Sequence, residues 1–387
     1  MEVRKRFIHF GCWNNLNEGT SSNLKGVMDK IKQTINQEQK QKPDFLSVAG
    51  DNYYPEKTTN HTTEENNKKI IKKNLIDGFS KLPTDIDIYM ILGNHDLEQL
   101  DHKNDDNDAD EDESKICVFK DEMENIRDKI HFDLFHTQYH NNTLILMLDT
   151  SMYEETATTE YLDCYTEFFK TTENSELSSV ELTIEKLKQD QLHKIITAIT
   201  SCKETGLTNV IMIGHHPIIG FKLKDSKDKQ IQDIISFYDV LKTIYTTINN
   251  TEVKYYYLCA DIHLYQAGII ELTIQNDETV DEVMTIHQYI VGTGGTALDT
   301  CPSSNNEDTP STNNLKYTMI DCKHTYGFLD CTIGGDEPSF TFVNIQGGGK
   351  KVRKNKKTKK KRKRKKTKNK RKRKRKSTKR NHKKKSP

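Results

Sequence analysis

Five apolar segments of this chain end in the same way, and this recurrence is the strongest constraint on how it folds. Each has the length and composition of a buried strand and is followed at once by Gly or Ala and then by metal-binding types of side chain. In an open α/β sheet, ligands bind outside the carboxyl ends of the strands, so we expect the five ends to form one site. They are Gly11-Cys12-Trp13, Gly50-Asp51-Asn52-Tyr53-Tyr54, Gly93-Asn94-His95-Asp96, Gly214-His215-His216-Pro217 and Ala260-Asp261-Ile262-His263.

The segments that carry these ends predict alternating strands and helices. A strand over 7–10, a helix over 24–37 and a strand over 45–48 form a βαβ unit, and a helix over 64–81 leads to a strand over 86–92. The right-handed crossover rule makes these strands parallel. Other expected strands cover 130–139, 143–149, 210–213 and 253–259, and a helix covers 181–201. Short alternating segments over 282–291, 315–322, 326–333 and 340–345 predict a second sheet packed on the first.

The charge of the chain is strongly partitioned. Of its 59 Lys and Arg residues, 27 lie between 350 and 387, where there is no Asp or Glu; 32 basic and 57 acidic residues remain before them, a net charge of −25. We expect one α/β domain over 1–345 and, over 346–387, a triple-Gly hinge and a disordered Lys/Arg-rich tail. Within the domain, 101–113 is almost free of apolar residues and predicts an acidic loop insertion, and 301–314 predicts a surface insertion.

The tail predicts binding to a polyanion such as nucleic acid or RNA, with an affinity that falls as salt rises. Nuclear targeting and attachment to an anionic surface are alternatives. No stretch near Met1 is apolar enough for a signal peptide, and no transmembrane segment is evident, which predicts an intracellular location. The eight Cys are scattered without tight pairs, so we expect them to stay reduced.

The GDN-Y-Y, GNHD, GHHP and LCADIHLYQ motifs resemble those of the calcineurin-like metallophosphoesterases, and among them the purple (tartrate-resistant type) acid phosphatases. The resemblance spans residues 7–345 and implies a four-layer α/β/β/α sandwich. It also implies a hydrolase that cleaves phosphate monoesters or diesters by attack of metal-activated water at a dinuclear centre. A pair of cations neutralises the phosphate and acidifies water.

The resemblance assigns a role to each polar residue. The first metal would be bound by Cys12, Asp51, Tyr54 and His263, and the second by Asp51, Asn94, His215 and Asp261, so that Asp51 bridges them. A Tyr at the Tyr54 position binds Fe(III) in this subgroup, which implies iron paired with Zn(II), Mn(II) or Fe(II). Asn94 also belongs to the expected substrate site.

His95 directly follows a ligand, and we expect it to contact the phosphate and to protonate the leaving oxygen, with Asp96 orienting its ring. Two interpretations of His216 stay open: a phosphate contact, or an exposed neutral turn residue beside Pro217. Lys222 or Lys224 could supply a cation for the phosphate.

Two residues depart from the resembled pattern: Cys12 stands where the family has Asp, and Asp261 where it has His. Both side chains bind metals, so we favour an altered centre over a lost one. The alternatives are a scaffold protein that keeps the fold without catalysis, and a polyanion-binding protein that acts through its tail. The substrate and the oligomeric state do not follow from the sequence.

Overall fold

The computed structural model describes residues 4–15, 21–37, 40–54, 76–100, 116–118, 128–155, 159–171, 183–203, 205–224, 228–275, 281–302 and 314–345. The chain divides into two compact units, Met1–Gln346 and Gly347–Pro387. The predicted acidic loop, the tail, most of the 301–314 insertion and most of the 64–81 helix lie outside the described residues. Residues 76–79, near the end of that helix, are helical.

The first unit contains two mixed β-sheets. The six-stranded sheet has the order β17 (Ser339–Asn344), β16 (Gly327–Ile333), β1 (Lys5–Phe10), β2 (Phe45–Ala49), β3 (Asp87–Ile91) and β6 (Ile130–Phe132). The seven-stranded sheet has the order β15 (Leu315–Lys323), β13 (Tyr265–Ile274), β14 (Glu282–Val291), β12 (Lys254–Cys259), β9 (Asn209–Ile213), β8 (Thr143–Leu148) and β7 (Phe135–His140). As predicted, β1, β2 and β3 are parallel.

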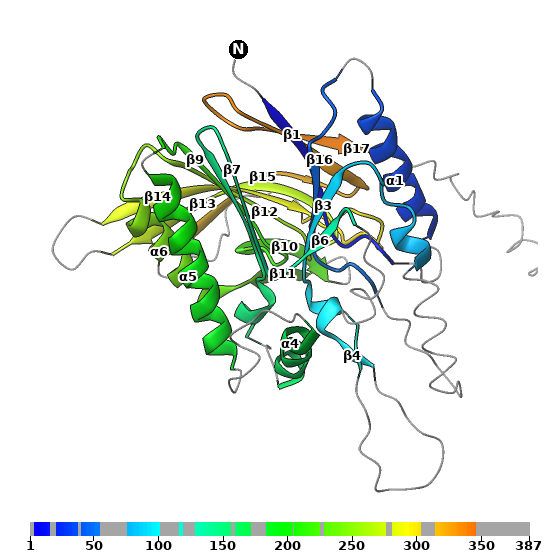
Figure 1. Ribbon diagram of the computed structural model, residues 1–387, viewed down its shortest axis with the longest axis horizontal. Helices are drawn as coiled ribbons and strands as arrows, with labels where there is room; N and C mark the ends of the chain where they lie inside the picture. The colour runs from blue at the N-terminus through cyan, green and yellow to red at the C-terminus, as the bar shows by residue number, and fades with distance from the viewer. Residues whose placement is uncertain are drawn as a thin grey trace, which may run out of the picture. The chain divides into compact units, whose positions relative to one another are not determined.

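Helices cover the outer faces of the sheets (Figure 1). The helices are α1 (Ser21–Ile35), α4 (Thr159–Thr171), α5 (Ile184–Lys203) and α6 (Tyr238–Ile248), with short turns η1 (Asn94–Leu97), η2 (Ser151–Tyr153) and η4 (Ile235–Phe237). Two small hairpins join β4 (Gln99–Leu100) to β5 (Ile116–Cys117) and β10 (Ile219–Lys224) to β11 (Asp228–Asp233).

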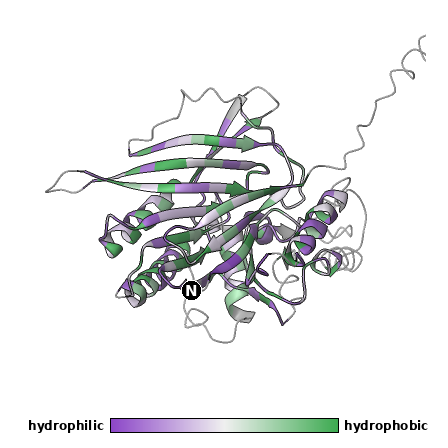
Figure 2. Cartoon of the chain, turned by 90° about the horizontal axis from the view of Figure 1, so that it is seen from above, coloured by the Kyte–Doolittle hydropathy of each residue, from purple (hydrophilic) through white to green (hydrophobic). Residues whose placement is uncertain are grey.

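Three apolar cores separate the four layers. One joins α1 to the six-stranded sheet, one joins α5 and α6 to the seven-stranded sheet, and one lies between the sheets, where Phe7 and Ile91 belong to the same cluster as Ile211 and Leu258. Figure 2 shows hydrophobic residues, in green, along the strands and helices. Every residue of β2, β8 and β9 is buried, as expected for strands covered on both faces. The fold is therefore the predicted α/β sandwich.

The structure corrects two predictions about the strands. The segment 130–139 is not one strand: it breaks at Asp133 and Leu134 into β6 and β7, which belong to different sheets. The late segments do not all join the second sheet, because β16 and β17 return to pair beside β1. Alternation along a strand shows that one face is buried, but it does not show which sheet buries it.

The prediction that all the cysteines stay reduced is wrong. Disulfides join Cys117 to Cys164 and Cys301 to Cys322, with Cα atoms 5.5 and 6.0 Å apart. The partners are 47 and 21 residues apart in the chain, so sequence spacing gave no sign of the pairing. The other four cysteines, Cys12, Cys202, Cys259 and Cys331, are free and buried.

Candidate metal centre

Sharp backbone bends deliver three of the predicted ligands to one place. Cys12, Asp51 and Asp261 follow β1, β2 and β12 and have φ values of 52°, 53° and 54°. A non-glycine residue in the left-handed region costs on the order of 1–3 kcal/mol, and such residues cluster at functional sites. Among the described residues there are two other non-glycine cases: Asn141 lies in the turn between β7 and β8, and Asn249 is the C-terminal cap of α6.

The site lies where the two sheets meet, not at the end of a single sheet. Asp51 comes from the six-stranded sheet, whereas His215 and Asp261 follow strands of the seven-stranded sheet. His215 Nδ1 donates to the carbonyl of Ala49 across 2.6 Å and so links the two sheets. Gly93 permits a close approach, since a Cβ there would lie only 2.4 Å from the Asp51 backbone nitrogen.

The first predicted group of ligands is assembled. Ligand atoms of Cys12, Asp51 and His263 lie within 4.8 Å of one another. The Tyr54 hydroxyl donates to Asp51 Oδ2 at 2.6 Å and lies 3.2 Å from His263 Nε2. One sulfur, one nitrogen and oxygen atoms from a carboxylate and a phenol therefore face a common point.

The second predicted group is assembled around His215. Its Nε2 atom lies 3.1 Å from Asn94 Oδ1, 3.3 Å from Asp51 Oδ1 and 3.9 Å from Asp261 Oδ1. Because Nδ1 is used in the hydrogen bond to Ala49, Nε2 is the ring nitrogen that faces these three oxygens. Four electron-rich atoms that converge in this way fit a cation.

Burial and charge keep the Cys12 thiol and the Tyr54 phenol protonated unless a cation is bound. Burial, Asp51 and Asp261 raise the pKa of the Cys12 thiol, and burial, Asp51 and Cys12 raise the pKa of Tyr54. The pKa of Asp51 is low because its histidine neighbours and Tyr54 outweigh the effect of burial. A coordinated metal reverses this balance, since it deprotonates a thiol outright. The donor set therefore fits a metal, with binding that releases protons.

His95 lies beside the site, but its partner is not the one predicted. Its Nδ1 atom contacts Glu98 Oε1 at 2.7 Å. Asp96 instead turns inward and accepts hydrogen bonds from the backbone of Gly93 and from Asn52. In a 3₁₀ turn such as η1, residues three positions apart lie on the same face. Glu98, three positions after His95, therefore lies against the His95 ring, and Asp96 does not. Burial lowers the pKa of His95, but Asp51 and Glu98 outweigh it and raise the pKa to about 9.

His216 is buried, so the interpretation of an exposed turn residue is wrong. Its Nδ1 atom lies 3.2 Å from Thr150 Oγ1 and its Nε2 atom 3.3 Å from Glu154 Oε1. Burial lowers its pKa, but Glu154 and nearby carboxylates reverse this and raise it. Its ligand atoms form a second close group with those of His215 and Asp261. A contact with phosphate stays a prediction.

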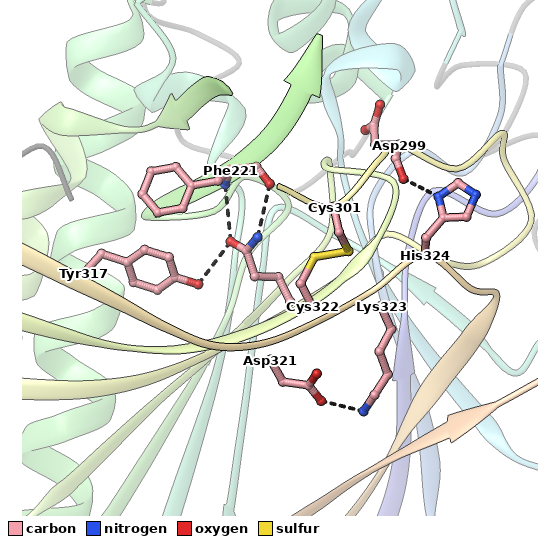
Figure 3. Close-up of a disulfide and its surroundings, with 9 residues drawn as sticks. Phe221, Asp299, Cys301, Tyr317, Asp321, Cys322, Lys323 and His324 are labelled. Carbon is pink, nitrogen blue, oxygen red and sulfur yellow. Dashed lines mark hydrogen bonds and ion pairs between the residues drawn. A yellow bond between two sulfur atoms is a disulfide. The ribbon is translucent and has the colours of Figure 1, made fainter. Parts of the chain in front are cut away.

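A disulfide-braced loop carries Asp299, which positions His263; Figure 3 shows Asp299, His324 and the disulfide. The backbone N–H of His263 donates to Asp299 Oδ2 at 2.9 Å, and the N–H of Asp299 donates back to the His263 carbonyl at 2.8 Å. His324 Nδ1 donates to the Asp299 carbonyl at 2.6 Å, and two residues further on Cys301 is joined to Cys322. The end of β15 thus anchors the loop that carries Asp299, and Asp299 in turn holds the backbone of the predicted ligand His263.

Sequence reasoning missed these supporting residues. Glu98 had a local signal, because a carboxylate three residues after a His lies within reach of its ring on one helical turn. Asp299 lies 36 residues from His263, and its pairing follows only from the tertiary structure. Lys222, one of two predicted phosphate cations, lies close enough to His263 to lower its pKa further, although burial is the main cause.

A family model described as calcineurin-like phosphoesterase matches residues 5–265, about two thirds of the chain. This match covers the five strand ends that build the site. The chain belongs to the calcineurin-like phosphoesterase family. No curated protein matches it.

The solved structures similar to this chain include proteins from Plasmodium, yellow lupin and Danio rerio. GAP50, the anchor in the inner membrane complex of Plasmodium, is 11% identical, with 90% of this chain and 86% of that chain covered and a TM-score of 0.48. Purple acid phosphatase PPD1 from yellow lupin is 12% identical, with 90% and 52% covered and a TM-score of 0.47. A dimetal phosphatase from Danio rerio is 10% identical, with 89% and 97% covered and a TM-score of 0.44.

No helix in the described part of this chain has the length and apolar character that a membrane span requires.

Proposed function

We propose that the chain is a metal-dependent hydrolase of phosphate esters, similar in type to the purple acid phosphatases, with a dinuclear centre. The observation that supports this most directly is the position of Asp51. Its Oδ2 atom faces Tyr54 in the first group of ligands, and its Oδ1 atom faces His215 in the second. A carboxylate with one oxygen toward each group is placed to bridge two cations, and such a pair stabilises both the attacking and the leaving oxygen.

The residues around this carboxylate have separate tasks in the proposal. His95 keeps the Nδ1 proton against Glu98, and we assign its Nε2 atom to donate a proton to the leaving oxygen. Asn94 and His216 complete the assigned substrate site. The proposed cofactor is Fe(III) paired with Zn(II), Mn(II) or Fe(II). Tyr54 would bind the Fe(III) as a phenolate, and that bond would give the protein a visible absorption band.

The proposal is tested by hydrolysis of a generic aryl phosphate monoester and the matching diester. We expect turnover that is lost after chelation and restored by Fe with Zn(II) or Mn(II). Folded protein that holds two metal ions per chain and hydrolyses neither ester would support the scaffold alternative instead.

Cys12 provides a prediction specific to this chain. If its thiolate is a ligand of the first metal, Cys12→Ala should weaken metal binding about 10–100-fold, a loss of the size seen even for residues that only support a ligand. Cys12→Asp should retain the metal and keep or raise activity, because it restores the residue that the resembled family has. Element analysis measures the first effect and an aryl phosphate assay the second. Metal content unchanged in both variants would make Cys12 a packing residue.

We further propose that residues 350–387 bind polyanions and govern location without contributing to catalysis. The supporting observation is the density of charge, 27 Lys and Arg without one Asp or Glu. Deletion of 350–387 should abolish salt-sensitive retention on nucleic acid or heparin, since counterion release from Lys and Arg contacts drives such binding. The aryl phosphatase rate constant should stay within about twofold at moderate ionic strength, where surface charges are largely screened. A large fall in rate, with metal content intact, would contradict this separation.

A further inference from the structure

The two groups of ligands differ in the kinds of atom that they offer. The first contains the Cys12 sulfur, the Tyr54 phenol and the His263 nitrogen beside Asp51. The predicted second group contains one nitrogen, His215 Nε2, and three oxygens from Asn94, Asp51 and Asp261. His216 lies close to this group, but its two ring nitrogens face Thr150 and Glu154. The low nitrogen content of the second group arises from Asp261, which replaces the His of the resembled pattern with a carboxylate.

Gln232 binds the Asp261 carboxylate through Oδ2, the oxygen that is not the one near His215. Its Nε2 atom donates to Asp261 Oδ2 in a short contact, while Asp261 Oδ1 remains 3.9 Å from His215 Nε2. One carboxylate oxygen is therefore used by the amide and the other faces the ligand group. The arrangement suits a ligand that offers one oxygen to a metal, since residues that bond to a ligand fix its orientation.

The hairpin of β10 and β11 brings Gln232 to this position. Gln232 pairs with Gly220 on the opposite strand. A Cβ on Gly220 would lie 2.5 Å from Cδ1 of Ile262, so glycine lets the hairpin pack against the Ile262 side chain without displacing it. Gln232 Oε1 is buried and has no hydrogen-bond partner among the residues that the structure describes. The Gln232 amide nitrogen therefore donates to Asp261, and the amide oxygen makes no hydrogen bond within that part of the chain.

Donor type determines which metal such a group favours. Carboxylate and carbonyl oxygens suit Mg(II) and Mn(II), whereas imidazole suits Zn(II), Fe and Cu. Resting on the proposed dinuclear centre, we infer that the second position is a manganese(II) site, in which Asp261 lowers the preference for Zn(II) over Mn(II) and Gln232 fixes Asp261 as a ligand. Gln232 is therefore a positioning residue, not a catalytic one.

The test measures Mn(II) binding to the full chain, with Zn(II) as the competitor. Binding is monitored through the electron paramagnetic resonance signal of free Mn(II). Asp261→His should raise the preference for Zn(II) over Mn(II) at least about tenfold, because it adds an imidazole. Gln232→Ala should weaken Mn(II) binding about 10–100-fold, as expected when the support of a ligand is lost. Gln230→Ala is the matched control, because Gln230 is an exposed residue of the same strand, and it should change neither quantity.

An unchanged Zn(II)-to-Mn(II) ratio in Asp261→His would overturn the inference, and Mn(II) binding to Gln232→Ala as tight as to Gln230→Ala would overturn the role of Gln232. If Asp261→His does not fold, the near-isosteric Asp261→Asn replaces it and should lose Mn(II) affinity by at least about tenfold; retained affinity would contradict us. The measurement needs no turnover. A chain that binds Mn(II) as expected but hydrolyses no ester would sink only the proposed function, whereas an active chain with an unchanged metal preference would sink only this inference.

Discussion

Replacing Asp51 with Asn should remove most of the bound metal and lower phosphate-ester hydrolysis by about a thousandfold or more. The reason is that Asp51, alone among the ligand residues that the structure describes, faces both groups, through Oδ2 to Tyr54 and Oδ1 to His215. An amide at this position keeps the shape but loses the negative charge. Metal ions contribute several kcal/mol of transition-state stabilisation, and each 1.36 kcal/mol is tenfold in rate.

Element analysis and an aryl phosphate assay on the same preparation measure both effects. Asp87→Asn is the matched control, because Asp87 begins β3 in the same sheet and forms a half-exposed pair with His131. It should leave metal content and rate unchanged. An Asp51→Asn protein that retains two metals per chain would show that the carboxylate does not bridge them.

His95→Asn should slow hydrolysis of esters with poor leaving groups by about 10²–10⁴-fold, the usual contribution of general acid–base catalysis. Activated aryl phosphates should lose much less, because their leaving oxygen departs without a proton. Metal content should not change, since the His95 ring contacts Glu98 and lies against Tyr54 rather than among the ligand atoms. A comparison of the two ester classes in one metal-loaded preparation measures the difference.

The pH dependence gives a second measure of the same role. A general acid works while it is protonated, and Asp51 and Glu98 raise the pKa of His95. The rate on poor leaving groups should therefore fall on the alkaline side, and His95→Asn should remove that fall. His131→Asn serves as the control, because His131 is a partly exposed residue paired with Asp87 away from the site. Equal losses on both ester classes would argue against a proton donated by His95.

The sequence predicted the strand ends well because their signals are local. Segments such as Phe45–Ala49 and Asn209–Ile213 are continuous apolar runs that suit only strands buried on both faces, and polar residues begin where they stop. All seven predicted ligand residues then lie in the two groups, because the parallel strands of each sheet bring their carboxyl ends together and the two sheets meet at these ends.

Features that depend on distant pairing could not be predicted in this way. The return of β16 and β17 to the first sheet is one, and the support of Asp261 by Gln232 is another. The disulfides are a third, since Cys117 and Cys164 meet only after the fold is formed. Disulfides persist in oxidising surroundings. The intracellular location remains a proposal from the sequence, and at that location the two disulfides would have to form and persist.

Asp96 illustrates a subtler failure. Its place directly after His95 made it the obvious partner, but the tight η1 turn directs its carboxylate to the Gly93 backbone and to Asn52. A side chain one residue away lies on a different face of a helical turn, whereas Glu98 is three residues away and shares the face of His95. Local geometry, not sequence adjacency, selects the partner.

In the proposed centre, two metal ions share the Asp51 carboxylate. Anomalous diffraction from crystals of the metal-loaded chain tests it most directly. We expect two peaks about 3.5–4 Å apart, one among Cys12, Asp51, Tyr54 and His263 and the other among Asp51, Asn94, His215 and Asp261. Well-ordered ligand residues with no anomalous peak between them, or one peak that Asp51 does not contact, would contradict the account.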